Sequence, residues 1–280
     1  MSDAIPEFNK SKAGEGQDVS LTNLSAFSSG PGIKSGAEVV AIALVAVLII
    51  GGVELALRLF NVPQYIMPPP SAIVQALFTE FPLIAPHLGY TLVELLGGFA
   101  IGAVIGLVLA AVITQFPFAE KIIAPYILLL VTTPMLALVP LLILRFGFGY
   151  TPRIIAVALA AGPMVMINAA TGFRRVDSAK IALARSYGAS TLQIFWKIRA
   201  PMALPMILVG LMIGAIFGLL TAVGAEMVGG GFGLGNRLTT YSSMIQMPQF
   251  FAVVLVLSIL GILIYILFFL IGKKWASWEA

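Results

Sequence analysis

The sequence predicts an all-α, polytopic membrane protein with six transmembrane helices. Hydrophobic residues make up 60% of the 280 residues and charged residues only 10%, whereas a soluble domain has about 45–50% apolar and about 25% charged residues. Six segments are apolar over the length of about 20 residues that a helix needs to cross a bilayer. The basic residues lie between these segments and form no single patch, so the expected partner is membrane lipid and not nucleic acid.

A polar segment, residues 1–35, precedes the first apolar stretch. It is rich in Ser, Gly and Lys, and it contains no apolar run that ends in a small-residue cleavage site. We therefore expect a mostly disordered cytoplasmic tail and not a removable signal peptide. Residues 36–280 form the predicted transmembrane domain. Because the chain has no cysteine and one histidine, we expect neither a disulfide nor a metal site.

The six predicted spans are joined by polar connections. They run near residues 36–60, 87–114, 119–146, 152–173, 205–228 and 250–272. The third span contains Pro125, Pro134 and Pro140, so we expect kinks there. Between the first two spans, prolines at 68–70 and Ser71 precede an amphipathic stretch, which predicts a separate short helix lying at the membrane interface.

The distribution of basic residues predicts the orientation of the chain. With the amino terminus inside, twelve of the sixteen Lys and Arg residues fall in cytoplasmic segments. The other four are Arg58, Arg145, Arg153 and Arg237, at the outer edge. Because basic residues are retained on the cytoplasmic side, both termini are predicted to be cytoplasmic.

The connection between the fourth and fifth spans is the most informative segment. Residues 174–199 carry six basic side chains and one acidic side chain, that of Asp177. The stretch SAKIALARSYGASTLQIFWKI has helical spacing that is interrupted at Gly188. This pattern predicts a helix, a glycine turn and a second helix on the cytoplasmic face, where a partner can dock. Composition alone equally allows a solvated basic loop that only sets the topology.

The run ALARSYGASTLQIFWKIRAP, residues 182–201, resembles the EAA loop of bacterial ABC importer permeases. The family pattern is Glu-Ala-Ala, three residues, Gly, nine residues, Ile, one residue, Leu, Pro. Gly188, Ile198 and Pro201 keep this spacing, whereas Ala182 replaces the Glu and Ala200 the Leu. Any anchoring role of that Glu is therefore left open here.

Flanking segments extend the resemblance over residues 67–272. They include MPPPSAIVQAL after the first span, TLVELLGGFAIGAVIG in the second, PLLILRFGFG at the end of the third, and LVGLMIGAIFGLLTAVGAEMVGGGFGLGNRL at the fifth. The likeness is to the branch that handles nitrate, sulfonates, taurine, bicarbonate and pyrimidine precursors. It implies the type I ABC importer permease fold, a bacterial inner-membrane location and a non-catalytic subunit, with ATP and Mg²⁺ held by partner ATPase subunits. It also implies an extracytoplasmic solute-binding protein and a homodimer of permeases.

The resemblance further implies that the loop forms a short coupling helix in a groove of the ATPase. The residues it assigns to this contact are Ala182, Ala184, Arg185, Tyr187, Gly188, Ala189, Ser190, Ile198 and Pro201. Arg185 could pair with a carboxylate of the ATPase, or it could be one of the basic residues that only keep this loop on the cytoplasmic side. The chain contains no GxxxxGK[ST] sequence, so nucleotide is expected to bind elsewhere.

Ionisable residues within predicted spans are candidates for the translocation path, because they are costly there. Glu54 is close to Arg58 near a span end, which favours a structural role. Glu94 is a candidate for contact with solute or with a partner helix. Glu226 precedes three glycines and is a candidate outer gate, with a snorkelling carboxylate as the alternative.

Milder path candidates are Thr132, Thr133 and Asn168. Threonine hydroxyls beside a proline commonly bond backbone carbonyls, and a buried Asn commonly bridges helices, so a structural role is favoured for all three. Glycines at 98, 102 and 106, and at 210, 214 and 218, form rows that predict close helix packing, within the subunit or across a dimer.

Two other classes of membrane protein fit the sequence less well. A secondary transporter or channel that works alone would show internal repeats and paired broken helices, which the sequence lacks. A membrane enzyme would need a constellation of acids, histidines or metal ligands in the spans. The sequence does not identify the solute, although the branch favours a small oxyanion or a compact organic molecule.

Overall fold

The computed structural model describes residues 36–275, with side chains from 37 to 274, so the predicted tail lies outside the described residues. The chain divides into two units after Ala56, and each is described by itself. The first contains most of α2 (Gly36–Leu59), an apolar helix with no buried residue along its span. Because the exposed surface of α2 is apolar on every side, this helix requires lipid or another helix around it.

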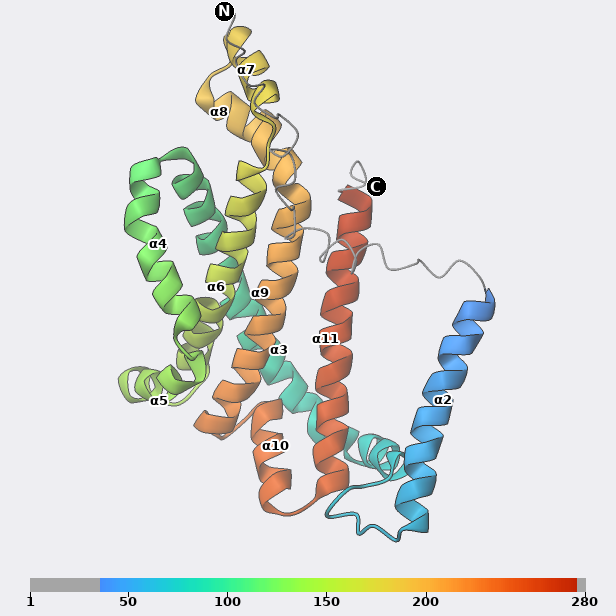
Figure 1. Ribbon diagram of the computed structural model, residues 1–280. Coiled ribbons are helices and arrows are strands. Elements are labelled where there is room, and N and C mark those ends of the chain that lie inside the picture. The colour runs from blue at the N-terminus through green and yellow to red at the C-terminus, as the bar shows by residue number, and fades with distance from the viewer. Residues whose placement is uncertain (1–35, 276–280) are drawn as a thin grey trace, which may run out of the picture. The chain divides into compact units, whose positions relative to one another are not determined.

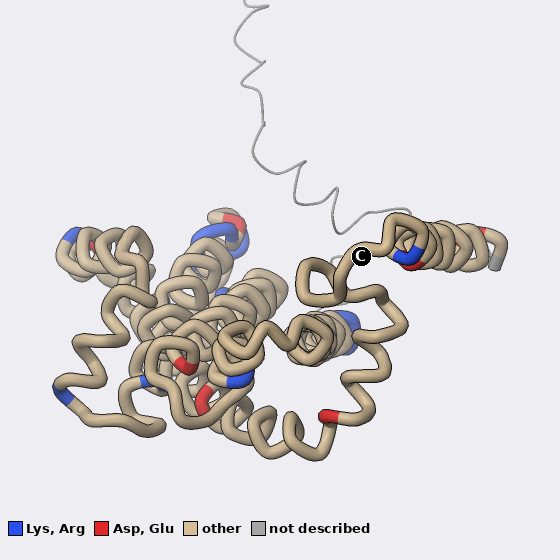
Figure 2. The backbone as a smooth tube through the Cα atoms, turned by 90° about the horizontal axis from the view of Figure 1, so that it is seen from below, with Lys and Arg blue, Asp and Glu red and all other residues tan. Residues whose placement is uncertain are grey.

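The second unit, from Leu57 onward, is built around three helices. These are α3 (Pro70–Gln115), α6 (Tyr150–Arg174) and α9 (Ala200–Gly229), and α6 packs extensively against both of the others. Around them lie α4 (Pro117–Thr132), α5 (Met135–Phe146), α10 (Leu234–Ser243) and α11 (Met247–Trp275) (Figure 1). Charged positions are sparse along the backbone, as Figure 2 shows.

The predicted glycine rows are packing surfaces within the subunit. A Cβ placed at Gly102 would lie 2.6 Å from the Ala158 carbonyl oxygen, and one at Gly106 would lie 2.5 Å from that of Gly162. From α9, a Cβ at Gly210 would lie 2.7 Å from the Cβ of Asn168 in α6. The glycines therefore let α3 and α9 approach α6 more closely than any side chain would permit.

Among the described residues, five helices are long and apolar enough to span a membrane, and α4 with α5 makes a sixth if the pair counts as one span. The six-span prediction is confirmed in this form. Of the expected kinks, the one at Pro134 is present, and α4 and α5 meet there at 96°. Pro125 and Pro140 lie inside helices and do not interrupt them.

The prediction of a separate interfacial helix after the prolines at 68–70 is wrong. That stretch continues into the second span as the 46-residue α3, with Pro82 and Pro86 inside it. Ile84 between these prolines is fully buried against α10 and α11, which holds the segment in line. A 46-residue helix is about 70 Å long, so part of it lies outside a hydrocarbon core of about 30 Å.

Candidate functional site

The segment between α6 and α9 protrudes from one end of the second unit (Figure 1). Its first helix, α7 (Ser178–Ser186), begins at Asp177, whose Oδ1 accepts a 2.8 Å hydrogen bond from the Ala179 N–H. A side-chain acceptor at this position satisfies an N–H that has no partner within the helix. No residue of α7 is buried, so this helix contributes nothing to the core and presents its surface outward.

Gly188 ends the turn after α7 with φ of +80°. The N–H groups of Gly188 and Ala189 donate to the carbonyls of Arg185 and Ala184, at 2.9 and 3.0 Å. A left-handed residue after a helix is the usual way to satisfy its last carbonyls, and glycine adopts this conformation without strain. The predicted helix–glycine–helix pattern is thus confirmed.

The second helix of the segment, α8 (Thr191–Ile194), begins with a capping box. The Ser190 N–H donates to Gln193 Oε1 at 2.8 Å, and the Gln193 N–H donates to Ser190 Oγ at 3.3 Å. The chain then passes through the π-helix η1 (Phe195–Arg199) directly into α9. α8 is therefore continuous with the helical chain of α9, without an intervening loop.

Aromatic packing anchors the base of this segment in the bundle. Phe195 and Ile194 are buried, and the Phe195 ring lies 5.1 Å from that of Phe173 at the end of α6. Beyond this base, Tyr187 is 84% exposed, and Leu183 and Leu192 are also exposed. Exposed apolar side chains gathered on one protrusion mark a surface for a partner.

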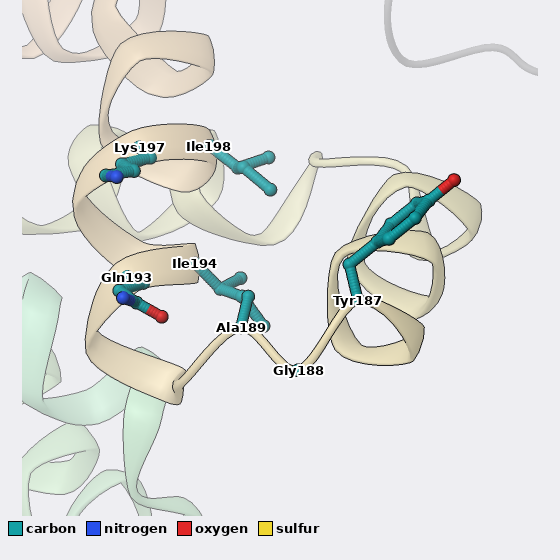
Figure 3. Close-up of a pocket in the computed structure, with 7 residues that line it drawn as sticks. All are labelled: Tyr187, Gly188, Ala189, Gln193, Ile194, Lys197 and Ile198. Atoms are coloured by element: carbon teal, nitrogen blue, oxygen red, sulfur yellow. The ribbon is translucent and has the colours of Figure 1, made fainter.

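A cavity of about 300 Å³ lies in the angle between the two helices (Figure 3). Tyr187, Gly188 and Ala189 line one side, and Gln193, Ile194, Lys197 and Ile198 line the other. Ile194 and Ile198 project into the gap, whereas Tyr187 stands on the α7 side (Figure 3). The remaining predicted contact residues do not line this cavity: Ala182, Ala184 and Arg185 lie on α7, Ser190 caps α8, and Pro201 lies in the first turn of α9.

A second polar cluster occupies the opposite end of the unit, here called the distal end. Arg153 of α6 and Glu94 of α3 form an ion pair, with Nη1 and Oε1 2.8 Å apart and exposed fractions of 2% and 0%. Arg153 was predicted to lie at the outer edge of a span, but its side chain is buried and not exposed there. Its guanidinium group is satisfied by Glu94 Oε1 and by two carbonyl oxygens of a loop.

Arg153 also holds the loop between α9 and α10. It donates to the carbonyl oxygens of Phe232, at 3.1 Å, and Gly230, and its guanidinium carbon lies 4.2 Å from the centre of the Phe232 ring. These contacts combine charge-assisted hydrogen bonds with a cation–π interaction. A single side chain thereby fixes α3, α6 and this loop relative to one another.

Glu226 of α9 binds the same loop from the other side. Its Oε1 accepts from Thr91 Oγ1 and its Oε2 accepts from the Gly235 N–H, both at 2.6 Å. The Leu234 N–H donates to Thr91 Oγ1 at 2.9 Å, and the Gly233 N–H donates to His87 Nδ1 at 3.0 Å. Because Glu226 is fully buried, the alternative of a snorkelling carboxylate is wrong.

The loop is also tied to the rest of the distal end through α10. The Tyr241 hydroxyl donates to Glu80 Oε2 of α3 at 3.1 Å. Burial, and secondarily the charge of Glu80, raise the pKa of Tyr241. The tyrosine therefore remains a hydrogen-bond donor throughout the neutral pH range.

The three milder path candidates lie apart from this network. Thr132 and Thr133 both donate their hydroxyls to the Leu129 carbonyl, at 3.1 and 2.7 Å, just before the break at Pro134. Asn168 Nδ2 donates to the Met164 carbonyl at 2.8 Å within α6. The two threonines satisfy a backbone carbonyl, as the structural interpretation predicted, whereas Asn168 bonds its own helix and not the neighbouring helix that was expected.

Sequence reasoning identified Glu94 and Glu226 but did not bring them together, and it missed Arg153, Thr91 and His87. One signal was available. His87, Thr91 and Glu94 follow the spacing i, i+4, i+7, which places three polar side chains on one face of an apolar helix. Nothing in the local sequence indicates that Arg153 lies against that face.

Comparisons with known proteins agree on one family. A family model described as "Binding-protein-dependent transport system inner membrane component" matches residues 102–277. The taurine transport system permease protein TauC of Escherichia coli (strain K12) is 28% identical over 223 residues, which cover 76% of this chain and 80% of that protein. The riboflavin transport system permease protein RibX of Chloroflexus aurantiacus is 29% identical over 231 residues, covering 81% and 85%.

The fold also matches a solved structure. A chain from inward-facing conformations of the MetNI methionine ABC transporter superposes with a TM-score of 0.63 at 19% identity, covering 70% of this chain and 97% of that chain. At this identity the likeness concerns the arrangement of the helices.

Proposed function

Because the chain belongs to the family of binding-protein-dependent transport system inner membrane components, we propose that its protruding segment, residues 174–201, is the joint through which ATPase subunits drive the permease. The chain is a multi-pass membrane protein and the permease subunit of an ABC importer.

The protrusion of α7 and α8 carries this proposal. A docking element must expose apolar side chains on one side and connect rigidly to the moving helices on the other. Tyr187 and Leu183 satisfy the first requirement, and buried Phe195 at the start of η1 satisfies the second. The cavity beside Gly188 is wide enough, at about 300 Å³, to receive a side chain from the ATPase.

ATP and Mg²⁺ are assigned to the partner ATPase. The sequence contains no GxxxxGK[ST] stretch that would cradle phosphates. We therefore expect this subunit to be non-catalytic, with an extracytoplasmic solute-binding protein as its second partner. Both termini are expected in the cytoplasm, on the side of residues 174–201.

The break between α4 and α5 is the proposed border of the translocation path. Backbone that leaves the helix at membrane depth is tolerated only where protein or a water-filled cavity covers it. The 96° bend lies beside the exposed Thr132, so lipid alone is a poor neighbour for it. A second copy of this chain, related by a two-fold axis, would cover the break and enclose the path. Glu94 and Glu226 are weaker candidates for lining the path, because their carboxyl groups bind other residues at the distal end.

The solute proposed is a small oxyanion or compact organic molecule, of the nitrate, sulfonate, taurine, bicarbonate or pyrimidine-precursor type. The resemblance to TauC supports this class. The name of RibX, however, indicates riboflavin, which is larger, so the branch alone does not decide the solute. Stimulation of ATP hydrolysis by the partner binding protein, loaded with each candidate in turn, identifies the cargo.

Site-specific crosslinking tests the docking assignment. The chain has no cysteine, so Ala182→Cys introduces a single thiol on exposed α7. We expect it to crosslink to a co-expressed ATPase subunit and to react with thiol reagents from the cytoplasmic side. The matched control is Ser242→Cys, exposed at the distal end, which should react only from the outside and give no crosslink. Labelling of Ala182→Cys from the outside would contradict both the orientation and the docking site.

A further inference from the structure

Three charged groups meet inside the distal end, and their charges do not balance. Glu94, Glu226 and Arg153 have exposed fractions of 0%, 0% and 2%. Two ionised carboxylates and one guanidinium would leave a net charge of −1 in the interior of the helix bundle. A buried charge without a partner is costly, so such groups are normally neutralised by protonation.

The hydrogen bonds show which oxygen lacks a donor. Both oxygens of Glu226 accept hydrogen bonds, from Thr91 and from the Gly235 N–H. Glu94 Oε1 accepts from Arg153. Glu94 Oε2 is buried and, within the described part of the chain, receives no hydrogen bond. Thr91, three residues before Glu94 on α3, donates to Glu226 Oε1, so the Glu226 carboxyl lies against the same face of α3 as Glu94.

We propose that Glu94 is a proton-binding site. Its Oε2 carries a proton and donates a hydrogen bond to the carboxylate of Glu226. The cluster then consists of one neutral acid, one carboxylate and one guanidinium, and its net charge is zero. Every oxygen of the two carboxyl groups has a donor or serves as one. The proton comes from water when the loop closes over the cluster, and it returns to water when the cluster is hydrated.

The surrounding groups are consistent with a proton at this position. From α6, Arg153 contacts Glu94, and from α9, Glu226 bonds Thr91 beside it. On α3 itself, His87 accepts from the loop, and on α10 the guanidinium carbon of Arg237 lies 6.0 Å from the centre of the Tyr241 ring. Tyr90 and Tyr150 pack against Phe232, 5.1 and 5.0 Å between ring centres, on the Arg153 side.

The site links protonation to closure of the loop between α9 and α10. Arg153 and Glu226 hold that loop through Gly230, Phe232 and Gly235. If the proton were lost while the loop was closed, the two carboxylates would repel each other. A folded state that keeps a proton which the unfolded chain has released loses stability as the pH rises. Closure of the loop is therefore expected to weaken at alkaline pH.

Infrared spectroscopy of the whole transporter in lipid nanodiscs tests the proposal. At neutral pH, we expect the wild-type protein to show the C=O stretch of a protonated, buried carboxyl group, which shifts in D₂O. Glu94→Gln removes the protonated group, so the band should vanish. Glu226→Gln should also abolish it, because Glu94 then ionises against Arg153. Glu80→Gln, on the same helix but outside the cluster, should leave the band unchanged.

A second measurement does not depend on the spectrum. Between pH 6 and pH 9 the apparent melting temperature of the wild type should fall relative to that of Glu94→Gln and Glu226→Gln. The reason is that the folded wild type holds one proton which the unfolded chain has released, and one such proton changes the folding equilibrium about tenfold per pH unit. Glu80→Gln should follow the wild type. A wild type without a protonated-carboxyl band, a band that persists in Glu94→Gln, or parallel melting curves would each overturn the proposal.

Discussion

Arg153 of α6 and Glu94 of α3 are ion-paired through Nη1 and Oε1 at 2.8 Å, with both side chains buried. The two residues are 59 positions apart in the chain, so the pair fixes the register of two transmembrane helices. Arg153 also contacts the Phe232 ring and carbonyl, which extends the link to the loop before α10. The distal end is thus organised around one arginine.

Replacement of this arginine should destabilise the protein strongly. In Arg153→Gln, the pair of Glu94 and Glu226 loses its counter-charge, and Glu94 Oε1 and the carbonyls of Gly230 and Phe232 lose their donor. Removing one partner of a buried pair costs about 3–5 kcal/mol. We expect a large fall in the apparent melting temperature and reduced yield from the membrane fraction. Arg145→Gln is the matched control, because Arg145 is exposed at the end of α5. Equal melting temperatures for the two variants would contradict the assigned role.

The packing of α3 against α6 should depend on Gly102. A methyl group there would lie 2.6 Å from the Ala158 carbonyl oxygen, a backbone atom that cannot move aside. Overpacking of this kind costs about 1–3 kcal/mol, so Gly102→Ala should lower the melting temperature of the detergent-solubilised protein. Gly97→Ala on the same helix meets only the Ile154 side chain at 3.5 Å and should have little effect. If Gly97→Ala were as unstable as Gly102→Ala, the close approach of α3 to α6 at Gly102 would not explain the loss of stability.

The six spans, the glycine rows and the helix–glycine–helix segment follow from the sequence because each depends on local periodicity or on a single backbone requirement. Gly188 needs a left-handed turn, and glycine alone supplies one cheaply. The angle of 96° at Pro134 could not be predicted, because proline indicates where a helix is interrupted but not by how much.

The distal cluster could not be predicted, because its members come from three helices and a loop. Glu94 and Glu226 were isolated candidates in the sequence, and Arg153 was placed at an edge because it lies near the start of its helix. The prediction of a separate interfacial helix is wrong for a related reason. The prolines at 68–70 and the amphipathic stretch after Ser71 indicated a short helix of its own, but the packing of Ile84 against α10 and α11 keeps α3 continuous. Long-range packing overrides local signals in both cases.

The turn at Gly188 should tolerate asparagine better than valine. With φ of +80° and open space around the position, the penalty comes from the backbone and not from a clash. Left-handed geometry costs a side-chain-bearing residue about 1–2 kcal/mol, with asparagine the least affected. Gly188→Val should insert into the membrane normally but lose ATP hydrolysis stimulated by solute-loaded binding protein, and Gly188→Asn should retain much of it. Normal stimulation in the valine variant would count against a coupling role for this turn.

Two aromatic residues in the protruding segment should separate docking from folding. Tyr187 is 84% exposed and Phe195 is 8% exposed, although they are eight positions apart in one segment. Tyr187→Ala should leave the melting temperature unchanged, because no packing is lost, but it should weaken copurification of the ATPase subunit and its stimulation. Phe195→Ala removes a core ring that contacts Phe173, at a cost of about 3–5 kcal/mol, and should lower the melting temperature before any partner is added. If Tyr187→Ala kept full ATPase binding while remaining folded, the exposed face of α7 would not be the docking surface, and the contact would have to be sought on α8 instead.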